Sequence, residues 1–154
     1  RLRRQVQLAE VVGDAGEHRV VTRTAVGLSP EGFPVSPDER LIVTVNMYRT
    51  YLPDMLSFFP GAQLNSLTLL EFDANSGALT VIDEYGFEGV LPEHAVFDAD
   101  GDSLAVAVYN YREAPFGAGA IEFWNVIQGN TPRLERTTQR LEVVRGPHNL
   151  QLIP

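Results

Sequence analysis

Short apolar runs alternate along the chain with turns that are rich in acidic residues, glycine or proline. Segments 66–72 and 120–126 carry large apolar residues two positions apart, which places them on one face of an extended strand. The second halves of segments 35–46 and 97–109 are rich in apolar, β-branched and small residues, as is typical of a strand buried on both faces. Nothing between these strands has the spacing of an amphipathic helix. The pattern therefore predicts an all-β protein.

The chain contains an internal repeat. Segment 35–46 resembles segment 97–109 once a one-residue gap is allowed at Gly101, and each reads as a short strand, an Asp-containing turn and an apolar strand. A longer connection, an alternating strand, a turn and a more polar strand follow in both copies. Each unit thus has four strands that become more polar toward the end of the unit.

Four-stranded units of graded polarity are typical of β-propeller blades, whose innermost strands crowd a central channel while the fourth faces solvent. We therefore interpret residues 1–154 as a single propeller segment. It begins with the outer strands of one blade and ends with the first strand of another, divided as 1–29, 30–91, 92–146 and 147–154. A β-sandwich is the alternative, because it also uses short alternating strands, although it does not predict the repeat.

Charge and composition exclude or disfavour several classes of function. The formal net charge of -8 disfavours binding to nucleic acids and to anionic membrane surfaces, and no apolar run is long enough to span a bilayer. The chain has no cysteine, which excludes disulfides and thiolate metal sites. Neither observation chooses between cytoplasm and periplasm, so localisation stays open. No sequence feature calls for a cofactor.

Three short motifs resemble one family. Residues 92–104, with Pro92-Glu93-His94 and a later Asp-Gly, look like the blade opening of lactonase-like and YVTN-type β-propellers. Residues 109–124 resemble the stretch that follows in that family, and 146–148 repeat the opening. The resemblance implies a seven-bladed ring. Blades missing from this chain would then come from the same polypeptide or from other copies of the chain.

In a propeller, the candidate site residues of this chain are expected to lie on one rim. The loops that open each blade and the loops between second and third strands emerge on the same rim. The predicted catalytic residues are Glu93, His94, His148 and Arg112. The predicted ligand-binding residues are Tyr48, Arg49, Tyr111 and Asn149.

These side chains suit a small anionic or sugar-derived ligand. Arginine binds carboxylates through paired hydrogen bonds, and histidine or glutamate transfers protons near neutral pH. The function predicted is ligand binding at the channel rim with hydrolysis of a cyclic ester. The alternative is a non-catalytic propeller that serves as a scaffold for proteins or ligands, in which these residues only hold loops together.

The sequence lacks the motifs of several other kinds of active site. The sequence has no Gly-x-Ser-x-Gly elbow, no phosphate-binding glycine loop and no His-Glu-x-x-His, and we predict no metal site. Alternating aspartates at 98–102 are explained by turn formation rather than by calcium binding. Residues 51–61 form an unusually apolar loop, which is interpreted either as a partner surface or as a lid.

Overall fold

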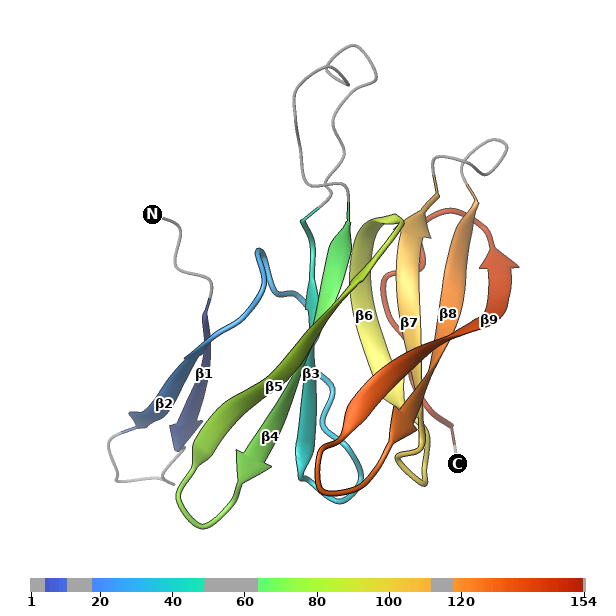
Figure 1. Ribbon diagram of the computed structural model, residues 1–154. Helices are drawn as coiled ribbons and strands as arrows, with labels where there is room; N and C mark the ends of the chain where they lie inside the picture. Colours follow the sequence, from blue (N-terminus) through green and yellow to red (C-terminus); the bar gives the residue numbers. More distant parts are fainter. Residues whose placement is uncertain (1–4, 11–17, 49–63, 112–117, 154) are drawn as a thin grey trace.

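The computed structural model describes residues 5–10, 18–48, 64–111 and 118–153 (Figure 1). Within these ranges the chain forms strands and no helix, so the predicted all-β class is confirmed. The strands are β1 (Gln5–Glu10), β2 (Arg19–Ala25), β3 (Leu41–Asn46), β4 (Asn65–Asp73), β5 (Ala78–Phe87), β6 (Val90–Phe97), β7 (Ser103–Asn110), β8 (Gly119–Ile127) and β9 (Arg133–Val143).

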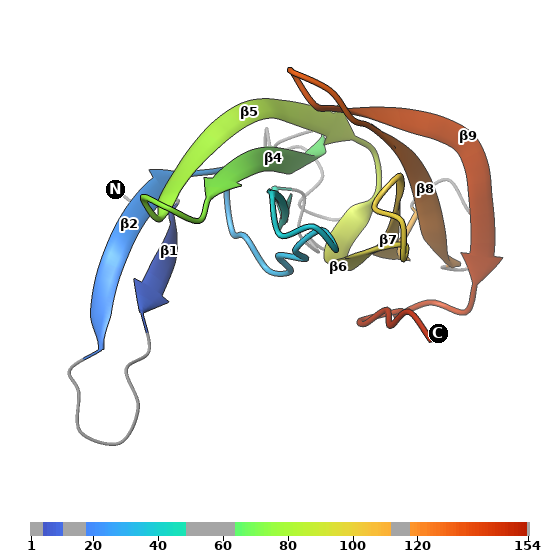
Figure 2. The ribbon, with the colours of Figure 1, turned by 90° about the horizontal axis from the view of Figure 1, so that it is seen from below.

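The strands build three antiparallel sheets in chain order. The first sheet contains β1 and β2, the second contains β3, β4 and β5, and the third contains β6, β7, β8 and β9. Viewed from below, the sheets stand side by side in an arc, with β5 and β9 on its outer side (Figure 2). Contacts between β2 and β5, between β3 and β6 and between β5 and β9 join neighbouring sheets. This is the arrangement of consecutive blades in a partial β-propeller.

In the second and third blades the last strand is the most exposed one, as the sequence predicts. β3 and β7 are buried along most of their length, whereas β5 and β9 alternate or are exposed. An apolar run suits a strand with protein on both faces, and a polar strand suits the edge next to solvent.

The inner strand of the second blade is irregular. Residues 30–36 run antiparallel to β3, with isolated bridges from Pro30 to Asn46 and from Val35 to Ile42. The backbone amides of Glu31 and Val45 also donate across this pair. Because the prolines at 30 and 34 have no amide hydrogen, the segment cannot form a continuous ladder.

The core lies between the blades. Trp124 of β8 contacts Phe87 and Tyr85 of β5 edge to face, with ring centroids 5.9 and 6.3 Å apart. The tryptophan is 3% exposed, as expected for a side chain packed between two blades. Around it pack buried residues from the second and third sheets, including Leu41, Val43, Leu67, Leu69, Ala95, Leu104, Val106 and Leu134.

The two copies of the repeat form the same hairpin. In the third blade, Asp98 Oδ1 accepts the amides of Asp102 and Ser103, and Gly101 has a φ of 77°. In the second blade, Asp38 accepts the Arg40 amide, and Glu39 has a φ of 59°. Both turns therefore need one left-handed residue, and an aspartate holds each turn closed.

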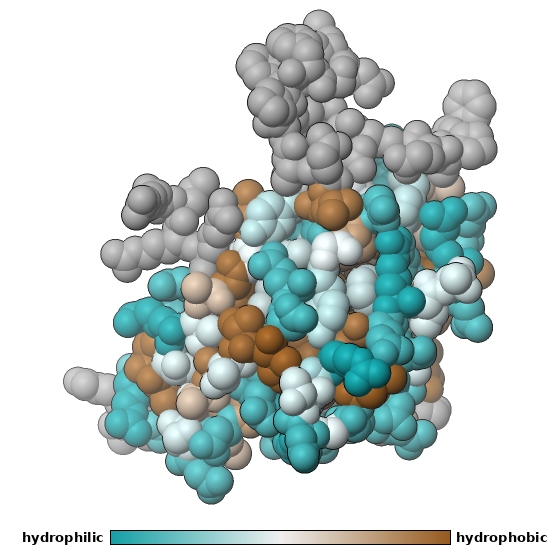
Figure 3. Space-filling model, viewed as in Figure 1, coloured by the Kyte–Doolittle hydropathy of each residue, from teal (hydrophilic) through white to brown (hydrophobic). Residues whose placement is uncertain are grey.

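The last segment forms no strand within the described residues. Residues 146–153 follow β9 and run along the inner side of the arc (Figure 2). The first strand of a following blade, expected at 147–154, stays a prediction. On the face shown in Figure 3, hydrophobic residues form separate patches among hydrophilic ones.

Candidate functional site at the blade openings

The three blade openings share a backbone feature. Ser29, Leu91 and Gly146 have φ values of 48°, 53° and 100°, and each immediately precedes a proline. A left-handed residue before proline turns the chain sharply from an outer strand toward the inner side of the arc. The residues that follow, Glu31, Glu93 and His148, therefore hold equivalent positions in consecutive blades.

Glu93 of β6 faces His148 from the next opening. Nδ1 of His148 lies 3.5 Å from Oε1 of Glu93, and their side chains are 65% and 20% exposed. The carboxylate is thus largely enclosed while the imidazole remains open to solvent. This geometry fits an Nδ1–H that points to the carboxylate, which leaves Nε2 of His148 as a proton acceptor.

His94 is held by the same inner segment. The Leu150 amide donates to Nδ1 of His94 over 3.4 Å, which assigns the ring proton to Nε2. On its other side the histidine abuts Gly32, where an added Cβ would lie 3.0 Å from the His94 Cα and 3.3 Å from Cδ2. A side chain at position 32 would therefore collide with the backbone that carries the histidine. Glu93, His94 and His148 are called the opening cluster below.

An aromatic ring supports the cluster. Tyr109 of β7 contacts His148 edge to face at 5.2 Å between centroids, and the Arg145 guanidinium lies 5.4 Å from the same ring. The Gly146 amide donates to the Tyr109 carbonyl over 3.1 Å. The loop before His148 is therefore fixed to the end of β7. Tyr109 begins one of the quoted motifs and Arg145 directly precedes another, but neither was predicted to be a site residue.

The remaining predicted residues are placed differently. Asn149 follows His148 and is exposed, and Tyr48 is half-buried two residues after the end of β3. Tyr111 is 5% exposed, and its hydroxyl donates to Glu122, so the structure does not bring it to the opening cluster. Arg49 and Arg112, with the apolar loop 51–61, lie outside the described residues. The functional roles predicted for all of these residues remain predictions.

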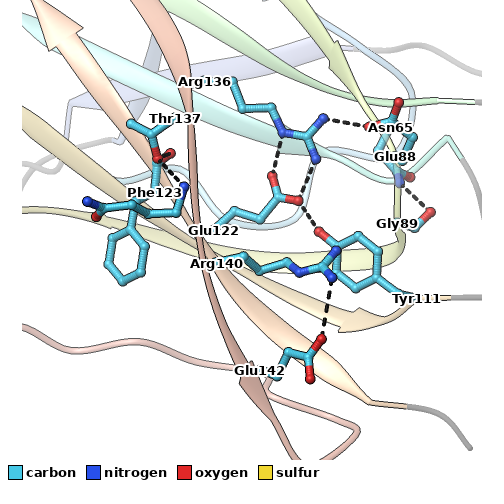
Figure 4. A network of polar contacts seen from close by, with 11 residues as sticks. Asn65, Glu88, Gly89, Tyr111, Glu122, Phe123, Arg136, Thr137, Arg140 and Glu142 are labelled. Atoms are coloured by element: carbon cyan, nitrogen blue, oxygen red, sulfur yellow. Dashed lines mark hydrogen bonds and ion pairs between the residues drawn. The ribbon is translucent and has the colours of Figure 1, made fainter. Parts of the chain in front are cut away.

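A second polar cluster was missed altogether (Figure 4). Glu122 of β8, 3% exposed, accepts two hydrogen bonds from Arg136 of β9, at 3.0 Å from Nε and 2.6 Å from Nη2. Nη1 of Arg136 lies 2.5 Å from Glu88, which follows β5. The arginine therefore links the second blade to the third. A glutamate within an otherwise apolar strand was the available signal, because a buried charge needs a partner.

Burial and charge shift two pKa values here. Burial raises the pKa of Tyr111, and the hydrogen bond to Glu122 raises it further. Burial alone would lower the pKa of Arg136, but its hydrogen bonds to Glu122 and Glu88 outweigh that effect and raise it. The tyrosine is therefore a neutral donor and the arginine a fixed cation at any ordinary pH. Both groups are structural in character, since neither exchanges protons near neutrality.

An open hollow of about 560 Å³ adjoins this network. It is lined by Glu122, Arg136, Thr137, Thr138, Gln139, Arg140 and Glu142. Its charged side chains are engaged with one another: Arg136 bonds Glu122, and Arg140 bonds Glu142 over 3.4 Å. The hollow thus offers no cation or carboxylate that stands apart from these internal pairs.

In the described part of the chain, no three His, Cys, Asp or Glu side chains gather so as to hold a metal ion. No helix in these same ranges has the length and apolar character to cross a membrane.

Comparison with known proteins identifies the fold. No family model and no curated protein matches the sequence, so the YVTN-type assignment stays a prediction. Among solved structures, the periplasmic gluconolactonase of Pseudomonas aeruginosa matches with a TM-score of 0.70 and 19% identity, over 94% of this chain and 36% of that one.

Two proposed 6-phosphogluconolactonases match similarly. That of Bacteroides fragilis gives a TM-score of 0.69 at 15% identity, over 94% of this chain and 35% of its own. That of Bacteroides uniformis gives a TM-score of 0.69 at 15% identity, over 94% of this chain and 36% of its own. The chain thus spans about a third of the length of the proteins it matches. Its fold is that of a partial β-propeller of the kind found in lactonase-like proteins.

Proposed function

We propose that this chain forms part of a lactonase-like β-propeller whose opening cluster binds a small anionic or sugar-derived molecule and hydrolyses a lactone in it. The observation that carries the proposal is that Glu93 and His94 of one blade opening both contact the segment of the next opening, Glu93 through His148 and His94 through the Leu150 amide. The similarity to a gluconolactonase and to proposed 6-phosphogluconolactonases supports the substrate class by analogy of fold.

Each member of the cluster has a distinct role in this proposal. His148, oriented by Glu93 through Nδ1, accepts a proton from water at Nε2, and the water oxygen attacks the lactone carbonyl carbon. His94 presents Nε2–H because its Nδ1 accepts the Leu150 amide, and this donor stabilises the oxygen that becomes negative.

The reaction then closes with a second proton transfer. The tetrahedral intermediate collapses, the bond from the acyl carbon to the ring oxygen breaks, and His148 returns its proton to that oxygen. The product is the open hydroxy acid. Because the same imidazole takes and gives the proton, no net proton stays on the protein.

Lactone hydrolysis by variants tests the proposal. We expect the protein to open gluconolactone or its 6-phosphate. His94→Ala and His148→Ala should lower turnover about a hundredfold or more, the usual loss for a group that transfers or donates a proton. The matched control is His18→Ala, since His18 is exposed and precedes β2, far along the chain from the cluster. Circular dichroism and thermal unfolding verify that each variant is folded.

The outcome distinguishes an enzyme from a scaffold. Loss of activity in both cluster variants with normal activity in the control supports catalysis at the blade openings. Equal rates in all three variants, or no hydrolysis by the unmodified protein, would contradict the proposal and favour the scaffold function.

A further inference from the structure

We propose that the hollow beside the Glu122 network is a second binding site, which takes a neutral polyhydroxylated molecule, a saccharide or a sugar alcohol. This site is separate from the opening cluster and does not depend on the reaction proposed there. The hollow has a volume of about 560 Å³, within the range of pockets that hold small ligands. Its described lining comes from β8 and β9.

A large bulge in β9 lies beside the hollow. Residues 137–139 are left out of the ladder between β8 and β9, where they stand opposite Phe123. The last strand of the second blade, β5, leaves out one residue, Ile82. Bulges re-aim side chains and are over-represented next to active sites. The third blade therefore departs from the second at the place where the hollow lies.

The unpaired polar groups of the bulge are uncharged. Among the described residues, the hydroxyl of Thr138 and the side-chain amide of Gln139 have no hydrogen-bond partner, and both side chains are exposed beside the hollow. A hydroxyl and a carboxamide can each donate and accept a hydrogen bond. The hydroxyl groups of a sugar do the same, so they match this part of the lining.

The charged groups of the lining are already paired with one another. Arg136 donates to Glu122 over 2.6 and 3.0 Å, and Arg140 lies 3.4 Å from Glu142. Two cations and two carboxylates thus give the lining no net charge. A charged ligand would have to break a pair or remain uncompensated, whereas a neutral one leaves both pairs intact. The formal net charge of -8 further disfavours an anion.

The wall of the hollow is held in place by internal contacts (Figure 4). The Arg140 guanidinium lies 4.7 Å from the centre of the Tyr111 ring, and the Tyr111 hydroxyl donates to Glu122. The Thr137 hydroxyl donates to the Phe123 carbonyl over 2.7 Å. Binding therefore needs to order little beyond the side chains of the bulge, which lowers its entropic cost.

The hollow lies on the face of β9 that a following blade would leave open. Because side chains alternate along a strand, Arg140 and Glu142 lie on one face of β9 and Leu141 lies on the other. Leu141 is 57% exposed, which marks its face as the one toward a following blade. On the side of the hollow, Arg136 reaches Glu88 at the end of the second blade. Further blades would therefore not close the site.

Titration of the ¹⁵N-labelled chain, followed by nuclear magnetic resonance, tests the site with methyl α-glucoside, sorbitol and sodium gluconate. Sorbitol and gluconate share a polyol chain, but gluconate ends in a carboxylate. We expect the two neutral probes to shift the amide signals of residues 137–139 saturably, with a Kd of about 1 to 10 mM. Gluconate should bind there at least about fivefold more weakly than sorbitol.

Two variants and a matched control assign the binding to the bulge. Thr138→Ala and Gln139→Ala each remove one uncharged hydrogen-bonding group. Each should weaken the binding of the neutral probes about threefold to tenfold, the scale of a neutral hydrogen bond. Thr80→Ala removes an exposed threonine from β5, and it should change the Kd by less than about 1.5-fold. Circular dichroism verifies that all three variants are folded.

Several results would overturn the inference. Among them are the absence of a saturable shift at residues 137–139 with both neutral probes and an unchanged Kd in both bulge variants. Equal affinity for sorbitol and gluconate would contradict the preference for a neutral ligand. Shifts centred on His94 and Leu150 would place the sugar in the opening cluster, which would contradict this second site while leaving the proposed function intact.

Discussion

Arg133 and Arg136 lie on the same strand but in different surroundings. Arg136 bonds the buried carboxylate of Glu122, whose side chain is 4% exposed, whereas Arg133 pairs with Glu135 at the surface, where both side chains are about half exposed. Breaking a buried pair leaves an uncompensated charge, and breaking a surface pair exposes both groups to water that already solvates them. The same chemical contact should therefore contribute very differently to stability.

Alanine substitution of each arginine measures this difference. We expect Arg136→Ala to lower the free energy of unfolding by about 2 kcal/mol or more. Arg133→Ala, the matched control on β9, should change it by less than about 0.5 kcal/mol. Urea unfolding followed by tryptophan fluorescence suits the measurement, because Trp124 packs close to Arg136. Similar losses in the two variants would show that the Glu122 network does not behave as a buried one.

The stability that Asp38 contributes to the repeated hairpin depends on pH. The hydrogen bond from Ser36, at 2.6 Å, lowers the pKa of Asp38 below its ordinary value of 3.8. A carboxylate with a lowered folded pKa stabilises the protein above its unfolded pKa, and this contribution disappears as pH falls through the folded pKa. The stabilising charge should therefore be present at neutral pH and lost below about pH 3.8.

The substitution Asp38→Asn isolates that charge. At pH 7 we expect the variant to be less stable by about 0.5 to 1 kcal/mol, a small value because the group is exposed. The gap should narrow as the pH falls below 3.8, where the native carboxyl also becomes neutral. Urea unfolding at several pH values measures this difference in stability between the variant and the unmodified protein. A difference that stays constant with pH would mean that charge is not the cause.

At the scale of elements, much of the blade architecture follows from the sequence. The alternating segment expected at 66–72 corresponds to β4, and the apolar runs of the repeat correspond to the buried strands β3 and β7. Binary pattern and turn residues act locally, so they are visible in the sequence. The irregular inner segment at 30–36 is less visible, because prolines interrupt hydrogen bonding without altering the apolar pattern.

The candidate site is less predictable than the strands for a physical reason. Glu93 and His94 could be singled out from a repeated motif, and their partners lie one blade further along the chain. The burial of Tyr111 depends on Glu122, which becomes its neighbour only when β7 and β8 pair. Likewise, Arg145 meets Tyr109 only through the loop that follows β9. Contacts of this kind require the tertiary arrangement.

The close approach of Gly32 to β6 gives a test at this scale. A methyl group at position 32 would lie 3.0 Å from the His94 Cα and 3.1 Å from the Glu93 carbonyl oxygen, so two inner strands must move apart. We expect Gly32→Ala to cost about 1 to 3 kcal/mol of stability and to reduce lactone turnover.

Gly86→Ala is the matched control. There the nearest atom is the Cδ1 of Leu64, at 3.1 Å, which can rotate away. The free energy of unfolding of the Gly86→Ala variant should differ from that of the unmodified protein by less than about 0.5 kcal/mol. If Gly32→Ala is as well tolerated as Gly86→Ala, the blade openings are not packed as tightly as described.

At the scale of the whole molecule, apolar side chains remain uncovered on the last blade. Leu141, Val144 and Ile153 are 57%, 90% and 84% exposed, and the proteins of similar fold are about three times as long. We propose that further blades, from the same polypeptide or from other copies of the chain, cover these surfaces. Light scattering on the purified 154-residue chain should accordingly show self-association. A stable, well-folded monomer would contradict the proposal and reopen the case for a closed sandwich.

The most direct test of the opening cluster as a binding site is nuclear magnetic resonance of the ¹⁵N-labelled chain during titration with 6-phosphogluconate, the product of the proposed reaction. The Leu150 amide donates to His94, so its signal reports on the cluster. We expect the largest changes at Leu150, Glu93, His94 and His148, with little change at Thr137 and Thr138 beside the Glu122 hollow. Changes centred on that hollow, or no saturable change at the blade openings, would contradict the assignment of the site.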